Sequence, residues 1–137
     1  DRLEHILDKN NGLLKKRNDG WAVLTDRYYF SSYAYQSVDM PMEWIINANL
    51  PAAKLMRPDA TIFLDISPEA AMERIRKGRE ETEQFENKER PRATREKYFE
   101  SFERLKESEK VEIVNADRPA EEIHNDIKNI VKSILNK

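Results

Sequence analysis

The sequence predicts an α/β fold, a three-layer sandwich with a parallel sheet, formed by 137 residues as a single domain. Short apolar segments alternate along the chain with longer amphipathic ones, the pattern of strands connected by helices. One segment, Ala60–Ile66, is apolar without alternation. It is therefore expected to be buried on both faces, as a central parallel strand is.

The N-terminal part predicts a helix, a strand and a second helix. In Asp1–Lys16, Leu and Ile recur near helical spacing, so this stretch is predicted to be one helix. Turn residues at 18–20 separate it from the apolar run Trp21–Leu24, which is predicted to be a strand. A polar and aromatic helix is expected from Tyr28 to about Ser37.

Two prolines mark the next helix. Pro41 can occupy its first turn, and apolar residues continue the helical pattern to Met56. Pro51 lacks an amide hydrogen and its ring crowds the preceding turn. We expect it to kink this helix or break it in two.

The C-terminal part predicts three helices and one more strand. Ser67 is suited to cap a helix and Pro68 to begin it, and this helix should end near Gly78. Pro91 begins another helix, which continues to Leu105. The remaining predicted elements are a strand at Val111–Val114 and an amphipathic helix from Pro119 to about Leu135.

Charge and composition exclude several classes of protein. Lys and Arg number 24 against 26 Asp and Glu, a net charge of −2, so nothing draws the whole molecule to nucleic acid or an anionic membrane. The absence of cysteine excludes disulfides, thiol catalysis and cysteine-bound zinc. No apolar run reaches the roughly 18 residues of a membrane helix. We expect a cytoplasmic protein.

Polar residues follow the predicted strand at Trp21–Leu24. In an open α/β sheet, ligands bind beyond the carboxyl ends of the strands. Arg27, beside Asp26, could bind a phosphate there through two parallel hydrogen bonds. An arginine that caps the sheet, before a helix packed by aromatics, fits these residue types equally well. Three residues on or near one face of the next helix could hydrogen-bond and stack with a base: Ser32, Tyr35 and Gln36.

A second feature is the charged stretch Glu73–Lys97, in which 16 of 25 residues are charged. For most of them, a solvated helical hairpin with ion pairs four residues apart is the simpler interpretation. Arg76, Lys77 and Arg79 nevertheless gather around Gly78, which could act as a hinge. A basic loop that closes over phosphates suits phosphoryl transfer, which needs charge neutralisation and exclusion of water.

These motifs, in their order, resemble the thymidylate kinase family. Asp26–Gln36 reads D-R-Y-Y-F-S-S-Y-A-Y-Q and is similar to the family's DRY…S…AYQ segment. The similarity continues through 57–59, 63–69, 85–87 and 95–98 to Asn115-Ala116-Asp117, over essentially the whole chain. It implies a P-loop nucleoside-monophosphate kinase fold. No G-x-x-x-x-G-K-[ST] motif is present, so we expect the C-terminal two-thirds of such an enzyme, without its first strand and phosphate loop and inactive alone.

The resemblance implies transfer of the γ-phosphoryl group of ATP to dTMP, with Mg²⁺ as cofactor. Arg27 would bind the acceptor phosphate, and Asp26 would lie near the Mg²⁺, through water. Arg2 would contact the thymine edge in a pocket lined by Ser32, Tyr35 and Gln36. Arg76, Lys77 and Arg79 would contact ATP phosphates from a lid at about 76–90, and one of them would reach the transferred phosphoryl group. The catalytic candidates are Asp26, Arg27 and Arg79, and Asn115 and Ala116 would lie near the adenine.

The resemblance also implies a homodimer, with Asp1–Lys16 and Pro41–Met56 as candidate interface helices. Three alternatives stay open. The first is a kinase of the same fold for another nucleotide or deoxynucleoside, against which Arg2, Ser32 and Tyr35 argue. The second is a non-catalytic relative that binds a nucleotide or a partner protein, which the missing phosphate loop favours. The third is a charged α/β domain without a site.

Overall fold

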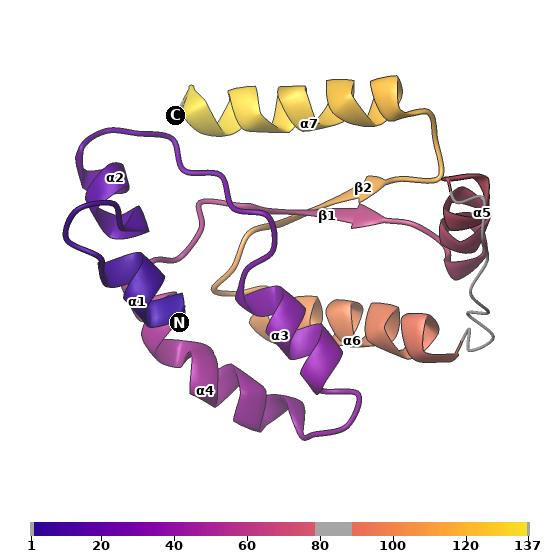
Figure 1. Cartoon of the computed structure of the whole chain (residues 1–137), viewed down its shortest axis with the longest axis horizontal. Helices are drawn as coiled ribbons and strands as arrows, with labels where there is room; N and C mark the ends of the chain where they lie inside the picture. The colour runs from indigo at the N-terminus through magenta and orange to yellow at the C-terminus, as the bar shows by residue number, and fades with distance from the viewer. Residues whose placement is uncertain (1, 79–88, 137) are drawn as a thin grey trace. The chain divides into compact units, whose positions relative to one another are not determined.

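The computed structural model describes residues 2–78 and 89–136. Two compact units are distinguished within the chain, Asp1–Pro58 with Thr94–Arg104 and Asp59–Ala93 with Leu105–Lys137. That the whole chain forms one domain stays a prediction. The described elements are α1 (Arg2–Leu7), α2 (Leu13–Asn18), α3 (Tyr29–Gln36), α4 (Met42–Leu55), β1 (Thr61–Asp65), α5 (Pro68–Gly78), α6 (Glu89–Leu105), β2 (Val111–Asn115) and α7 (Ala120–Leu135) (Figure 1).

The second unit is built on a parallel strand pair. β1 and β2 run in register from Thr61 opposite Val111 to Asp65 opposite Asn115, and α7 lies along them (Figure 1). The parallel α/β arrangement predicted from the sequence is therefore confirmed. The core between sheet and helix consists of buried Val114, Ala116 and Ile123 with Ile62, Ile66, Ile127 and Ile130 around them.

The predicted strand at Trp21–Leu24 is wrong. Residues 21–25 have no regular structure, and the Leu24 side chain is 94% exposed. A strand is defined by hydrogen bonds to a neighbouring strand, and in the described residues β1 and β2 pair only with each other. The apolar composition of residues 21–24 favours a strand, but a strand also requires a partner strand to hydrogen-bond with, and composition does not indicate whether one is present.

The prediction that β1 is buried on both faces is also wrong. Leu64 of β1 is 46% exposed, and Ile113 of β2 is 51% exposed. Their register places them on opposite faces, since Leu64 pairs with Val114 and Ile113 with Phe63. Neither face of the strand pair is therefore fully covered within this unit.

The predicted helix Asp1–Lys16 is two helices. Asp8 Oδ1 accepts hydrogen bonds from the backbone N–H groups of Asn10 and Asn11, each at 2.7 Å. This turn competes with the helical hydrogen bonds, and Asn and Gly are poor helix formers. The pKa of the Asp8 carboxyl is lowered, chiefly by the Asn11 and then the Asn10 amide. The interruption between α1 and α2 is thus encoded at Asp8–Gly12.

Pro51 does not break its helix, because α4 is continuous from Met42 to Leu55. The predicted start of α5 is confirmed, whereas α6 begins at Glu89, two residues before the predicted Pro91. The Ser67 hydroxyl accepts from the Ala70 amide at 3.2 Å and caps α5, which starts at Pro68. Pro91 lies in the first turn of α6, where its missing amide hydrogen costs no helical hydrogen bond.

The first unit is held by apolar and aromatic contacts. Ile6, Ala52 and Met56 form a buried cluster, joined by Leu13, Leu14, Val23 and Tyr28. Tyr29, Phe30 and Tyr33 of α3 are also buried, and the Phe30 ring meets the Phe102 ring of α6 edge-on at 5.2 Å between centroids. α3 is therefore fixed from α6 through its aromatic side chains.

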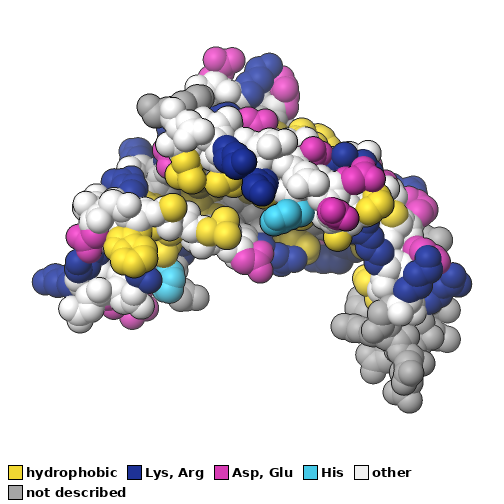
Figure 2. Space-filling model, turned by 90° about the horizontal axis from the view of Figure 1, so that it is seen from above, with side chains coloured by type: hydrophobic (Ala, Val, Ile, Leu, Met, Phe, Trp, Pro, Cys, Tyr) yellow, Lys and Arg dark blue, Asp and Glu magenta, His cyan; other side chains and the backbone are white. Residues whose placement is uncertain are grey.

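Charged side chains of both signs occupy much of the face seen in Figure 2, with hydrophobic side chains between them. This surface agrees with a sequence in which 36% of the residues are charged. Within 2–78 and 89–136, every helix is too short or too polar to cross a membrane.

Candidate functional site

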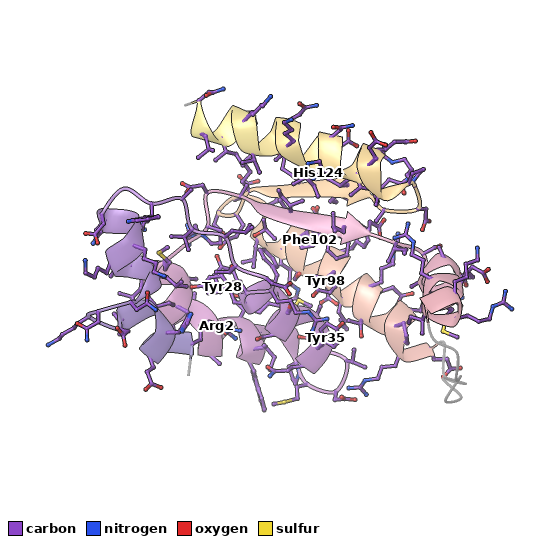
Figure 3. The ribbon with its side chains drawn as sticks, turned by 45° about the horizontal axis from the view of Figure 1, so that its top comes forward. Arg2, Tyr28, Tyr35, Tyr98, Phe102 and His124 are labelled. Atoms are coloured by element: carbon purple, nitrogen blue, oxygen red, sulfur yellow. The ribbon has the colours of Figure 1, made fainter. Side chains whose placement is uncertain are left out.

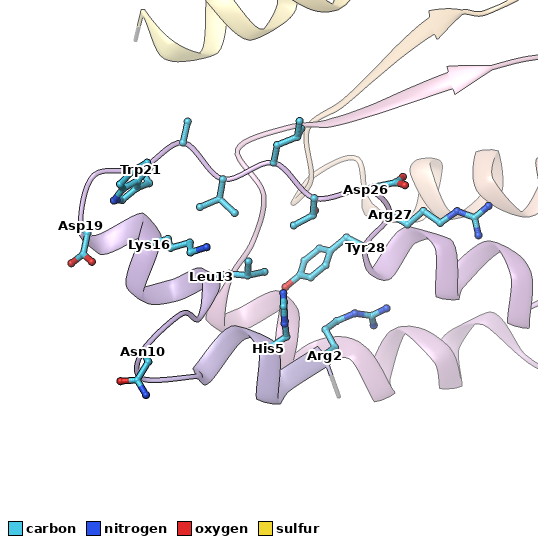
Figure 4. A pocket seen from close by; sticks show the side chains of 14 residues that line it. Arg2, His5, Asn10, Leu13, Lys16, Asp19, Trp21, Asp26, Arg27 and Tyr28 are labelled. Atoms are coloured by element: carbon cyan, nitrogen blue, oxygen red, sulfur yellow. The ribbon is translucent and has the colours of Figure 1, made fainter.

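An open hollow of about 940 Å³ lies in the first unit (Figure 4). It is formed by α1, α2 and the irregular segment between Trp21 and Tyr28. Arg2 and His5 enter it from α1, and Asp26 and Arg27 line it just before α3. The two arginines predicted to bind a nucleotide monophosphate therefore border one hollow. Figure 4 shows both side chains extending along α3.

Arg2 is held by two side chains from different helices. Its Nη2 donates to Ser32 Oγ of α3 at 3.0 Å, and its Nη1 donates to Asn49 Oδ1 of α4. The guanidinium carbon lies 5.5 Å from the centroid of the Tyr28 ring, within the range of a cation–π contact. The structure thus brings Arg2 and Ser32 together, and it adds Asn49, which sequence reasoning missed.

Arg27 has a left-handed backbone and a stacked side chain. Its φ is 62°, the one positive value for a non-glycine residue in the described part of the chain. A side chain costs about 1–2 kcal/mol in this conformation, and such outliers often mark functional sites. Arg27 Nη2 donates to the Tyr35 hydroxyl at 3.3 Å, and its guanidinium carbon lies 5.1 Å from the centroid of that ring. Two predicted site residues are therefore in direct contact.

Tyr98 of α6 supports this pair. Its ring meets the Tyr35 ring edge-on with centroids 6.3 Å apart (Figure 3), and its hydroxyl lies 2.9 Å from the Ser31 hydroxyl. Burial raises the pKa of the Tyr98 phenol, although the hydrogen bond with Ser31 opposes this. The phenol therefore stays protonated to a higher pH than a free tyrosine does.

The side chains of Gln36 and Asp26 are both exposed. Gln36 is the last residue of α3, one turn after Ser32, and its side chain is exposed. Asp26 is exposed beside Arg27. Among the residues that the structure describes, no three His, Cys, Asp or Glu side chains gather as a metal-binding group. The role of Asp26 near Mg²⁺ stays a prediction.

The basic residues at the end of α5 are paired with one carboxylate. Arg76 Nη2 and Lys77 Nζ lie 2.9 and 3.3 Å from oxygens of Glu73. Hydrogen bonds from Lys77 and then Arg76 lower the pKa of the Glu73 carboxyl. Both cations remain largely exposed, so these ion pairs hold them weakly. The predicted catalytic residue Arg79, and residues 79–88 of the predicted lid, lie outside the described residues.

The loop after β2 is fixed by short-range and long-range hydrogen bonds. Asn115 Oδ1 accepts from the Asp117 amide at 2.8 Å, and Ala116 is buried. Arg74 Nη2 donates to the carbonyl oxygens of Ala116 and Arg118 at 2.7 and 3.0 Å. Sequence reasoning gave Arg74 no role, because nothing distinguishes it from the other charged residues of its segment.

Comparisons with known proteins agree on one family. The model of the family described as thymidylate kinase matches residues 1–127. A probable thymidylate kinase of Archaeoglobus fulgidus is 34% identical over 133 residues, which is 95% of this chain and 63% of that protein. One of Thermococcus onnurineus is 38% identical over 138 residues, 100% of this chain and 63% of that protein. A thymidylate kinase of Symbiobacterium thermophilum is 33% identical, covering 98% and 61%. The chain thus spans less than two thirds of these relatives.

Proposed function

The chain belongs to the thymidylate kinase family, and from this premise we propose that it carries the acceptor site of an enzyme that phosphorylates dTMP to dTDP with ATP. One observation supports this most directly. Each of two arginines expected at a nucleotide monophosphate is hydrogen-bonded to a residue of α3 expected in the same pocket, Arg2 to Ser32 and Arg27 to Tyr35. Together with the family membership, this arrangement favours a site over the alternative of a charged α/β domain without one.

In this proposal the two arginines bind different groups of the acceptor nucleotide. Arg27 binds the dTMP phosphate, whose oxygens its planar guanidinium can contact in pairs. Arg2 donates to the thymine edge, and Ser32, Tyr35 and Gln36 line the base pocket. A phosphate oxygen of dTMP attacks the γ-phosphorus of ATP while the bond to the β-γ bridging oxygen breaks, with ADP as leaving group. Catalysis comes from positioning and charge stabilisation, without a covalent enzyme intermediate.

Mg²⁺ fits the residues present. It is commonly bound by one or two carboxylates together with substrate phosphates and water, and Asp26 offers one exposed carboxylate next to Arg27. When bound, the ion neutralises charge that develops on the phosphates. Asp26 would hold it through water.

The ATP side of the proposal rests on the second unit and on further residues. Arg76, Lys77 and Arg79 would contact the ATP phosphates, with Arg79 acting on the transferred group, and Asn115 and Ala116 would lie near the adenine. The 137 residues hold no G-x-x-x-x-G-K-[ST] motif. We infer that this motif is supplied by a segment other than these residues, and that the chain alone is inactive. The proposal includes a cytoplasmic homodimer.

A non-catalytic relative that binds a nucleotide is the second candidate, favoured by the same missing motif. The experiment that decides is ADP release by the product of the complete reading frame, with Mg·ATP and dTMP, dUMP, dCMP, AMP or thymidine as acceptor. Selective turnover of dTMP supports the proposal. Turnover of another acceptor alone would assign a different kinase. A folded product that phosphorylates none of these acceptors would support the second candidate, the non-catalytic relative that binds a nucleotide.

A further inference from the structure

We propose that Asn49 is a positioning residue that fixes the Arg2 guanidinium, and through it the discrimination between thymine and cytosine. This inference rests on the proposed function for the identity of the base. Its structural part concerns Arg2 alone and can be tested without any activity. Arg2, Asn49 and their partners all belong to the first unit.

The orientation of the Asn49 amide is determined by its own helix. Asn49 Nδ2 donates to the carbonyl oxygen of Ile45, one turn earlier in α4, at 2.8 Å. An amide that donates through nitrogen on one side presents its oxygen on the other. Oδ1 therefore faces Arg2 as an acceptor, and a flipped amide would lose both hydrogen bonds.

The Arg2 guanidinium is fixed at three points. Asn49 accepts from Nη1, Ser32 accepts from Nη2, and the Tyr28 ring lies against the guanidinium. Two hydrogen bonds at different nitrogens define the plane of the group as well as its position. Asn49 is half-buried, so water competes less for its oxygen than at the surface.

An arginine with a fixed guanidinium distinguishes two bases by whether each presents a hydrogen-bond acceptor or a donor to it. A guanidinium has five N–H donors and no acceptor. Asn49 and Ser32 use two of them, which leaves donors for a carbonyl oxygen such as O4 of thymine. Cytosine presents an amino group at that position, and two donors repel each other. If Arg2 could rotate away, this repulsion would be avoided and discrimination would fall.

The test compares three variants in the complete protein. Asn49→Leu keeps the size of the side chain but removes the acceptor, Asn49→Asp keeps an acceptor for Arg2, and Asn47→Leu is the control, since Asn47 is exposed on the same helix. We expect Asn49→Leu to raise KM for dTMP about tenfold with kcat nearly unchanged, the loss expected for one charge-assisted hydrogen bond. The preference for dTMP over dCMP should fall by a similar factor. Asn49→Asp should restore most of both, because its carboxylate accepts from Arg2 as an ion pair, although it loses the donation to the Ile45 carbonyl. Asn47→Leu should change neither.

A second readout separates this inference from the proposed function. Slow rotation of the guanidinium about Nε–Cζ is visible in the NMR signals of the Arg2 Nη hydrogens without any nucleotide. We expect resolved signals in the unaltered protein and in Asn49→Asp, and averaged signals in Asn49→Leu. If the unaltered protein turns over no dTMP, the function falls and the NMR comparison still decides whether Asn49 fixes Arg2. Equal KM, selectivity and NMR signals in Asn49→Leu and Asn47→Leu would overturn the inference. Should Asn49→Leu not fold by circular dichroism, Asn49→Ala makes the same test.

Discussion

The hydroxyl oxygens of Ser31 and Tyr98 lie 2.9 Å apart and join α3 to α6 across 67 positions of sequence. The same Tyr98 ring meets the ring of Tyr35, which in turn stacks with Arg27. A row of contacts therefore runs from α6 through α3 to the arginine expected at the acceptor phosphate. We therefore expect substitutions of Tyr98 on α6 to alter the position of the Arg27 side chain.

The Ser31–Tyr98 hydrogen bond should contribute measurably to stability. We expect Tyr98→Phe and Ser31→Ala each to lower the free energy of unfolding by about 1 kcal/mol, the usual net value of one hydrogen bond. The double variant should cost less than the sum of the two, because both single changes remove the same bond. Urea unfolding of the four proteins measures the coupling. Strict additivity would show that the two hydroxyls do not interact in solution.

Tyr98 should also make stability depend on pH in alkali. Its folded-state pKa is raised, chiefly by burial, so its contribution is complete below the unfolded value of about 10 and is lost as pH rises through the folded pKa. We expect the unaltered protein to lose more stability above pH 10 than Tyr98→Phe does. Absorbance titration of tyrosinate should show a late-ionising component that is one tyrosine smaller in Tyr98→Phe, since buried Tyr29 and Tyr33 also ionise late. Ser31→Ala should delay it further, since this hydrogen bond opposes the raised pKa. A Tyr98 that ionises at or below pH 10 would contradict the assignment.

Two substitutions of Arg27 should reduce activity equally and differ in stability. Arg27→Gly and Arg27→Ala both remove the guanidinium, so we expect each to reduce kcat/KM for dTMP at least about a hundredfold, as loss of one transition-state donor does. Glycine accepts the φ of 62° without strain, whereas alanine does not. Arg27→Gly should therefore be about 1 kcal/mol more stable than Arg27→Ala in urea. Near-normal turnover in either variant would refute the phosphate-binding role.

The boundaries set by local chemistry were predictable from the sequence. The Ser67 cap with Pro68, and Pro91 in the first turn of α6, depend only on neighbouring residues. The strand predicted at Trp21–Leu24 failed because a strand needs a neighbour, which a local pattern does not report. Likewise the helix over residues 1–16 failed because the side chain of Asp8 competes for backbone hydrogens.

The candidate site also contains residues that local motifs predict and a residue that depends on a distant partner. Arg2, Arg27, Ser32 and Tyr35 were predicted as site residues from motifs. Their roles stay predictions, but the structure pairs Arg2 with Ser32 and Arg27 with Tyr35. Asn49 was not identified, because its function depends on a hydrogen bond to a residue 47 positions away. One asparagine on a helix is an ordinary surface residue unless its partner is known. Contacts of this kind are visible only in three dimensions.

The turn between α1 and α2 should tolerate no side chain at Gly12. A Cβ there would lie 2.4 Å from the carbonyl oxygen of Asp8 and 2.8 Å from its amide nitrogen, both backbone atoms. We expect Gly12→Ala to lower the free energy of unfolding by about 1–3 kcal/mol, the usual cost of overpacking. Gly20→Ala is the matched control. A Cβ at Gly20 has no heavy atom within 4 Å, so this substitution is destabilising only through the backbone strain of a φ of 87°. Urea unfolding should rank Gly12→Ala as the more destabilising of the two. The reverse order would mean that the turn at Asp8–Gly12 is looser than its hydrogen bonds indicate.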